Sequence, residues 1–184
     1  MQHHGAPTRL LDFDYSIYIA AYFALENADS DCAVWAVNLW WAVRQSKKLL
    51  LRVEGKKESA QRMVEFTQES HEKDYNNLLF EKPFVRVAFS LNPFRLNERL
   101  RTQHAVFIAP GTVSDSFMRN LVALDGHEKS DNLIKIVIPH ELRKEALERL
   151  FDMNISRTSL FPGLDGYAQS LGIFHPSFRE VRCK

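Results

Sequence analysis

The first thirty residues constrain the fold more than any other part of the chain, because a short strand pattern runs almost directly into an apolar helix. Pro7 biases the residue before it towards extended geometry, so Thr8–Phe13 is predicted to be a strand. Ile17–Leu25 contains no charged side chain, and its apolar residues surround most of a helix that continues to about residue 28. Asp14 or Ser16 can cap that helix. We therefore predict a buried helix packed on a sheet.

The rest of the chain interleaves strand and helix patterns without the regular spacing of a doubly wound sheet. Four further strands are predicted at Cys32–Leu39, Phe84–Ser90, Ala105–Ala109 and Leu133–Ile138. Helical patterns occupy Trp40–Leu51, Lys56–Glu72, Leu96–Arg101, Ser114–Leu124, Pro139–Met153 and Ser159–Leu171. The first of these patterns is ambiguous, and the second is typical of an exposed amphipathic helix. This order predicts an α+β fold, with packed helices and a mixed or antiparallel sheet that contains all five strands.

Length and charge limit the class of protein. A chain of 184 residues without a repeat or linker is predicted to form a single domain over residues 1–184. The net charge of +1 indicates no general nucleic-acid-binding surface. No apolar run approaches the roughly 20 residues of a membrane-spanning helix, and the two cysteines, Cys32 and Cys183, suggest no disulfide framework. We expect a soluble cytoplasmic protein that does not interact with membranes.

Common catalytic and metal-binding signatures are missing from the sequence. It contains no glycine-rich nucleotide loop, no Gly-x-Ser-x-Gly and no His-Glu-x-x-His. His3 and His4 are adjacent, and adjacent side chains of a strand point to opposite faces. We therefore predict no metal site.

Polar residues beside the predicted strands are candidates for a site. Arg9 offers a guanidinium suited to a phosphate or carboxylate, although an ion pair within the protein would use it equally well. Asp12 could act as a base or an orienting acceptor, or it could cap the following helix. Gln103 could hold a ligand hydroxyl or satisfy backbone groups at the start of a strand. We predict that these three side chains lie in one cleft, where loops present polar groups on a rigid frame.

Each of the remaining polar and aromatic candidates could have a functional or a structural role. An imidazole suits acid–base chemistry near neutral pH, but a structural hydrogen bond is the commoner role for a residue such as His4. The indoles of Trp35, Trp40 and Trp41 could form a stacking platform, but their apolar surroundings favour core packing. The predicted ligand-binding residues are His4, Thr8, Arg9 and Ser16, and the predicted catalytic residues are Asp12 and Gln103.

Three blocks of the sequence resemble the FRG domain family. The first is Gln2-His3-His4-Gly5-Ala6-Pro7-Thr8-Arg9-Leu10-Leu11-Asp12-Phe13, followed by Ser16 and Ala20-Ala21-Tyr22-Phe23-Ala24. The second is Asn97–Phe107, and the third is Leu160–Gly166. The family has a Phe/Tyr-Arg-Gly tripeptide before the first block, so the resemblance implies that this chain lacks that segment. Ala105 and Ile17 also depart from the family's glycine and proline. The resemblance by itself implies no particular reaction.

The order of these blocks is also similar to that of the ADP-ribosyltransferases. In those enzymes an early Arg or His holds NAD, a strand ending in Ser or Thr leads into a helix with Ala-x-x-Phe-Ala, and a glutamate block precedes a Pro-Gly-Thr turn. This chain has Ser16, then Tyr22-Phe23-Ala24, then Gln103–Thr112 ending in Pro-Gly-Thr. Ala105 stands where the catalytic glutamate would fall, and a methyl group can neither orient a nucleophile nor stabilise a cationic centre.

Two hypotheses about function follow from these resemblances. In the first, the chain binds a nucleotide-like ligand such as NAD, and any enzymatic activity is ADP-ribosyl transfer or NAD hydrolysis. We expect that activity to be weak or absent, because Ala105 and the missing segment remove two contributions to ligand binding and transition-state stabilisation. In the second, the chain is a non-catalytic recognition module with a protein partner. The sequence alone leaves both open.

Overall fold

A computed structural model describes residues 8–62, 72–91, 98–164, 166–168 and 170. Its contacts divide the chain into two compact units. Unit 1 consists of residues 1–13, 35–94 and 106–134, and unit 2 consists of residues 14–34, 95–105 and 135–184. Each unit has its own apolar core. That residues 1–184 form a single domain stays a prediction.

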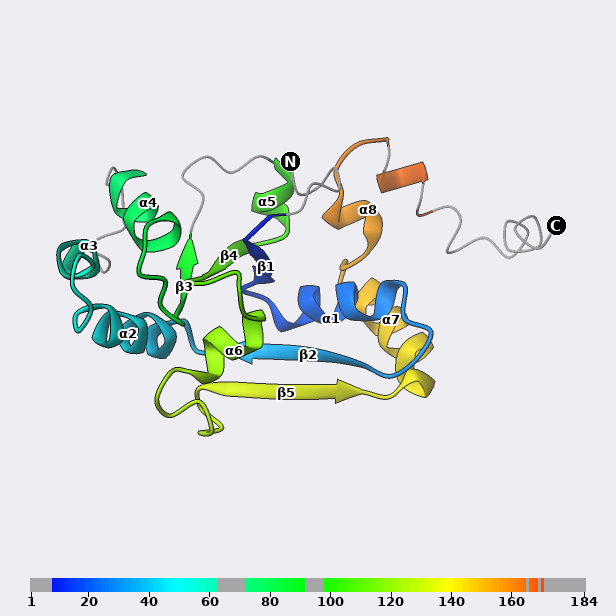
Figure 1. Ribbon diagram of the computed structural model, residues 1–184. Coiled ribbons are helices and arrows are strands. Elements are labelled where there is room, and N and C mark those ends of the chain that lie inside the picture. Colours follow the sequence, from blue (N-terminus) through cyan, green and yellow to red (C-terminus); the bar gives the residue numbers. More distant parts are fainter. Residues whose placement is uncertain (1–7, 63–71, 92–97, 165, 169, 171–184) are drawn as a thin grey trace. The chain divides into compact units, whose positions relative to one another are not determined.

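The helices and antiparallel strands of the described residues confirm the predicted α+β class (Figure 1). The strands are β1 (Leu11–Asp14), β2 (Cys32–Val37), β3 (Ala88–Leu91), β4 (Ala105–Pro110) and β5 (Leu133–Ile138). The α-helices are α1 (Ile17–Glu26), α2 (Leu39–Leu50), α3 (Lys57–Arg62), α4 (Glu72–Phe80), α5 (Glu98–Thr102), α6 (Phe117–Val122), α7 (Arg143–Asp152) and α8 (Arg157–Leu160). A 3-10 helix, η3 (His140–Leu142), precedes α7.

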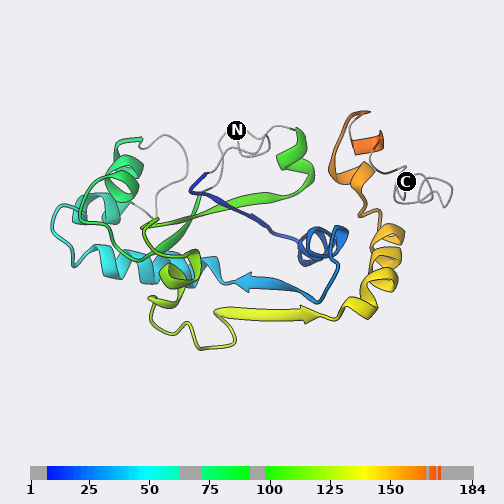
Figure 2. The same cartoon turned by 45° about the vertical axis from the view of Figure 1, so that its right-hand side comes forward.

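The prediction that all five strands share one sheet is wrong. The strands form a three-stranded sheet in the order β1-β4-β3 and a separate ribbon of β2 and β5, which run in opposite directions in Figures 1 and 2. The apolar run of β2 suggested a central strand, yet Trp35 is 39% exposed. Val137 of β5 is 54% exposed. β-Branched and aromatic residues favour strands whether or not both faces are covered, so their presence does not reveal how many neighbours a strand has.

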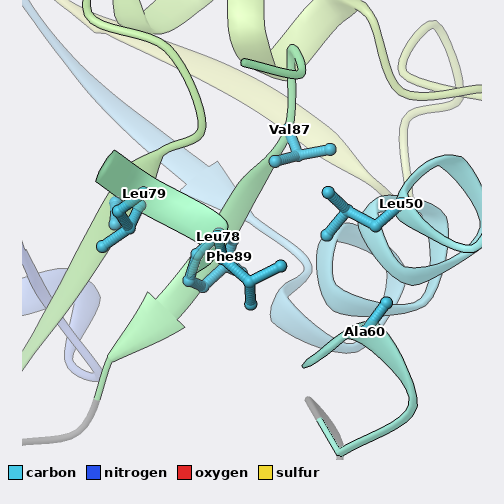
Figure 3. Close-up of a cluster of buried hydrophobic side chains, with 7 residues drawn as sticks. Leu50, Ala60, Leu78, Leu79, Val87 and Phe89 are labelled. Carbon is cyan, nitrogen blue, oxygen red and sulfur yellow. The ribbon is translucent and has the colours of Figure 1, made fainter. Parts of the chain in front are cut away.

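Unit 1 is built around β3, with helices packed on both of its faces. One apolar cluster joins α2, α3 and α4 to β3 and is shown in Figure 3, where its labelled members are Leu50, Ala60, Leu78, Leu79, Val87 and Phe89. A second cluster joins α2, β3, β4 and α6 through Trp41, Ala42, Ala88, Ile108, Leu121 and Leu124. The alternating side chains of β3 therefore contribute to two different clusters, as the pleat of a strand buried on both faces requires.

At Ala88 the backbone of β3 finds a hydrogen-bond partner on the edge that faces away from β4. Its register with β4 is antiparallel, and the amide of Gly111 donates to the carbonyl of Val87 at 2.8 Å. Ala88 lies opposite Pro110 and directs its own amide and carbonyl away from β4. The Ser46 hydroxyl of α2 meets both, donating to the Ala88 carbonyl at 2.8 Å and accepting from its amide at 3.2 Å. A side chain thus takes the place of a neighbouring strand.

The N-terminal part of the predicted Lys56–Glu72 amphipathic helix has exposed and buried residues, and its buried side includes Lys56 and Ser59 as well as Ala60. Lys56, Ser59 and Ala60 are buried, and α3 is described as far as Arg62, because residues 63–71 lie outside the described residues. The Lys56 ammonium donates to the carbonyls of Asn77 and Glu81 at the end of α4, where helix carbonyls lack partners. Burial lowers the pKa of Lys56.

Unit 2 packs α1 against α7 and α8. Ile19, Tyr22 and Leu25 of α1 are buried with Leu150 and Leu160. Ile17 and Tyr18 are 50% and 54% exposed, so α1 is less enclosed than the buried helix that was predicted. A helix that is apolar all round carries no pattern that tells which face meets the core.

The loop between β4 and α6 is held by buried polar groups. The Asn120 side chain accepts from the Thr112 amide at 3.1 Å and donates to the Thr112 carbonyl at 2.9 Å. Asp115, at the surface of the same loop, accepts from Arg86 at 2.6 Å and from Arg119 at 3.3 Å. These two hydrogen bonds, the one from Arg86 first, lower the pKa of the Asp115 carboxyl.

The lowered pKa of Asp115 predicts an acid-dependent loss of stability. The folded chain binds the Asp115 proton less readily than the unfolded chain, so the stabilisation is present above the ordinary value of 3.8 and is lost as the pH falls through the lowered pKa. We expect Asp115→Asn to be less stable than the unsubstituted chain at neutral pH, with the difference shrinking in acid. Urea unfolding at several pH values measures it. Asp152→Asn, at another exposed carboxylate, serves as control, and an equal pH dependence of both variants would refute the prediction.

Candidate functional site

Arg9 of unit 1 is bonded to backbone carbonyls from two other segments. Its Nη1 donates to the Leu79 carbonyl in the last turn of α4, and its Nη2 donates to the Gly111 carbonyl after β4 at 3.3 Å. The guanidinium lies 5.2 Å from the centre of the Phe80 ring. Partial burial lowers the pKa of Arg9. This geometry is close to the second role considered for Arg9, an ion pair within the protein, except that the partners are backbone carbonyls and not a carboxylate. The ligand-binding role of Arg9 stays a prediction.

Thr8 and Asp12 present their polar groups at the surface. Both residues are exposed, and the Thr8 hydroxyl donates to the Leu10 carbonyl at 3.3 Å. Among the residues that the structure describes, none forms a hydrogen bond or ion pair with the Asp12 carboxylate. Asp12 therefore does not act as the helix cap considered for it, and its oxygens face solvent.

Gln103 of unit 2 is buried, with only 4% of its surface exposed. Its Nε2 donates to the carbonyl of Leu160 at 3.0 Å, which ties the turn before β4 to α8. The next residue, His104, has a φ of 51°, a conformation that few non-glycine residues adopt, and its carbonyl accepts from the Tyr15 amide at 3.1 Å. Gln103 thus satisfies a backbone group, the second of its two predicted roles.

One residue from each of the three FRG-like blocks contributes to a cluster around Phe161 in unit 2. The guanidinium groups of Arg99 and Arg157 lie 4.4 and 4.5 Å from the centre of its ring. The edge of Phe23 approaches the same ring, with centroids 5.9 Å apart. Arg99 belongs to the second block, Phe161 to the third and Phe23 to the first. The resemblance therefore includes residues that contact one another in the fold. Neither arginine was predicted as a site residue, although Arg99 lies in the second block, because their stacking on Phe161 depends on the fold.

Glu26 is the most enclosed carboxylate of this cluster. Its Oε1 accepts from the Tyr22 hydroxyl at 2.7 Å and pairs with Nη1 of Arg157, and its side chain is 7% exposed. Arg143 donates to the carbonyls of Leu25 and Glu26 at 2.8 and 2.6 Å, at the end of α1. Burial, and next the hydrogen bond to Glu26, raise the pKa of the Tyr22 hydroxyl. The i,i+4 spacing of Tyr22 and Glu26 was the available sequence signal, and the pair was not predicted.

The remaining predicted site residues are Ser16 and His4. Ser16 is the N-cap residue of α1 but its side chain makes no capping hydrogen bond, and His4 lies outside the described residues. The common cleft for Arg9, Asp12 and Gln103 stays a prediction, because Gln103 belongs to unit 2 and the other two to unit 1.

Core packing was predicted for all three tryptophans and holds for one. Trp41 is 2% exposed and donates from Nε1 to the Asp125 carbonyl at 2.8 Å, whereas Trp35 and Trp40 are 39% and 84% exposed. Within the described ranges, no group of three or more His, Cys, Asp or Glu side chains could hold a metal ion. Likewise, none of the helices described is both long and apolar enough to cross a membrane.

Comparison with known protein families finds a similarity in the N-terminal segment. The family model of the FRG domain matches residues 1–32, which contain Thr8, Arg9, Asp12, Ser16 and α1. No curated protein and no solved structure matches the chain. The similarity to ADP-ribosyltransferases receives no support from these comparisons and stays a hypothesis.

Proposed function

We propose that the chain is an FRG-like domain that binds a nucleotide-like ligand such as NAD, with little or no turnover. The match to the FRG family over residues 1–32 covers five of the six predicted site residues, all except Gln103. The observation that supports binding most directly is the exposed Asp12 carboxylate on β1, which keeps its acceptor oxygens available. Carboxylates commonly accept hydrogen bonds from the ribose hydroxyls of dinucleotides.

Low turnover is proposed because Ala105, at the start of β4, supplies no carboxylate. In the motif order of the ADP-ribosyltransferases this position would carry the glutamate that acts on the ribosyl centre. Losing one preorganised electrostatic group typically lowers a rate by about 10²–10³. Binding without efficient chemistry is therefore the expected behaviour.

Calorimetric titration with NAD, together with an assay of nicotinamide release, tests this proposal. We expect measurable binding, nicotinamide release near background, and affinity lowered about tenfold by Asp12→Asn, since a hydrogen bond to a charged group contributes roughly 1.5–3 kcal/mol. Asp152→Asn is the matched control, because Asp152 is also an exposed carboxylate but lies on α7. Arg9→Ala is a poor probe, because Arg9 holds two carbonyls of the fold. Equal affinities for both Asn variants, or rapid turnover by the unsubstituted chain, would contradict the proposal.

A second candidate function, a non-catalytic recognition module, is favoured by the use of Arg9 and Gln103 within the protein. Their donors are directed to the carbonyls of Leu79, Gly111 and Leu160. If the unsubstituted, folded chain binds no NAD in the titration above, this second function is the better one.

A further inference from the structure

One face of α2 combines an exposed indole with a row of positive charges. Trp40 is 84% exposed, and Arg44 and Lys48 follow it at four-residue intervals, both exposed; Arg52 continues the spacing just after the helix. Four residues of an α-helix advance about 6 Å and return to nearly the same side. We call Trp40, Arg44, Lys48 and Arg52 the α2 face.

The charge around this face is strongly one-sided. Residues 39–62 contain seven Lys and Arg side chains against two carboxylates, in a chain whose net charge is only +1. Three of the seven are used inside unit 1, because Lys56 caps α4, Arg62 pairs with Asp74 at 2.6 Å, and Lys47 donates to the Gln61 carbonyl at 3.1 Å. Within the part of the chain that the structure describes, Arg44, Lys48 and Arg52 form no ion pair. Their charges are therefore open to a partner from outside.

Helix stabilisation alone does not account for this face. Lys47 and Lys48 lie in the last turn of α2, where positive charge interacts favourably with the helix dipole. That reason does not extend to Arg44, which lies in the middle of the helix, or to Trp40, which lies in the first turn. The neighbouring Trp41 already fills the core position at 2% exposure, so Trp40 adds exposed apolar surface without adding to the core.

We propose that the α2 face binds an acidic segment of a partner protein, whose carboxylates pair with Arg44, Lys48 and Arg52 and whose apolar side chain covers Trp40. Tryptophan and arginine are the residues most enriched among the strongest contributors to protein–protein binding. A positive row also steers an acidic partner to the surface and fixes its register. This surface is separate from β1 and does not depend on nucleotide binding.

An acidic protein segment fits the α2 face better than a nucleic acid or a membrane. Residues outside 39–62 carry a net negative charge, since that segment alone exceeds the chain's total of +1, and they would repel a long polyanion. A membrane surface would need several apolar side chains to enter it, whereas the α2 face offers the single indole of Trp40.

Fluorescence titration with short synthetic peptides of graded net charge, each carrying one leucine or phenylalanine, tests the proposal. We expect affinity to rise with the negative charge of the peptide, to fall with added salt, and to be accompanied by a blue shift of tryptophan emission as Trp40 is covered. Trp40→Ala and the double substitution Arg44→Glu with Lys48→Glu should each weaken binding about tenfold or more. These side chains are exposed, so circular dichroism should show all variants folded.

Matched controls and competing ligands decide the outcome. Lys144→Glu and Phe151→Ala replace a similarly exposed cation and an exposed aromatic on α7, and should leave binding unchanged. Asp12→Asn should also leave it unchanged. The proposal is overturned if no acidic peptide binds, if the α7 controls weaken binding as much as the α2 variants, or if oligothymidylate or phosphatidylserine vesicles bind the α2 face more tightly than the peptides.

Discussion

Replacing Glu26 by alanine is expected to destabilise the folded chain by about 3–5 kcal/mol, the usual cost of removing one partner from a buried ion pair. The substitution leaves the Arg157 guanidinium, whose side chain is 19% exposed, without its carboxylate. It also leaves the Tyr22 hydroxyl without its acceptor. Both groups stay in the core of unit 2, so solvent cannot fully replace what they lose.

Urea unfolding monitored by circular dichroism measures this loss of stability, and two further variants are compared with Glu26→Ala. Glu26→Gln keeps an acceptor oxygen for Tyr22 but removes the charge, and should cost less than the alanine variant. Glu145→Ala breaks the exposed i,i+4 pair with Arg149, whose side chains are 58% and 75% exposed, and should cost under about 1 kcal/mol. A loss for Glu26→Ala as small as that for Glu145→Ala would mean that the Glu26 pair contributes no more than a surface pair.

Gly111→Ala is expected to be the other severe substitution, costing about 3 kcal/mol or more because it forces atoms into a packed core. A Cβ at residue 111 would lie 2.2 Å from the Val85 carbonyl oxygen and 2.4 Å from a methyl group of Val87. The first of these is backbone, so a side-chain rotation cannot relieve the contact. Relief would separate β4 from the segment leading into β3 and would disturb the carbonyl that accepts from Arg9.

Gly55 provides the matched control for Gly111. A Cβ at residue 55 meets no atom within 4 Å, but its φ of 77° is unfavourable for alanine. Gly55→Ala should therefore cost only about 1 kcal/mol, from backbone conformation alone. Thermal or urea unfolding of the two variants separates close approach from backbone conformation, and equal losses would show that the space around Gly111 can adjust.

Local patterns in the sequence predicted most elements but not their partners. β5 was predicted with its exact bounds, and α7 and α6 were found within a few residues, because proline, serine caps and apolar periodicity act over short distances. No pattern identified α4, whose Leu78 and Leu79 are among the most buried residues of unit 1. The division into two sheets also depends on pairing between distant segments, which strand propensity does not encode.

The candidate site shows the same limit. Arg9 and Asp12 lie within residues 1–32, which the FRG family model matches, whereas Gln103 lies outside that match, and the site roles of all three stay predictions. Their partners could not be predicted, because the carbonyls bound by Arg9 come from residues 79 and 111. Glu26 and Arg157 are 131 positions apart in the chain, so neither residue suggested the other.

The Ser46 hydroxyl on Ala88 has a consequence for how copies of this chain behave at high concentration. β3 is the last strand of its sheet, and the amide and carbonyl of Ala88 are among the groups that an added strand from another copy would need. Such a strand could pair there only after displacing α2, together with the apolar side chains that α2 buries. Intermolecular strand addition, and with it fibril growth from this edge, is thereby opposed by a single hydroxyl and the helix that carries it.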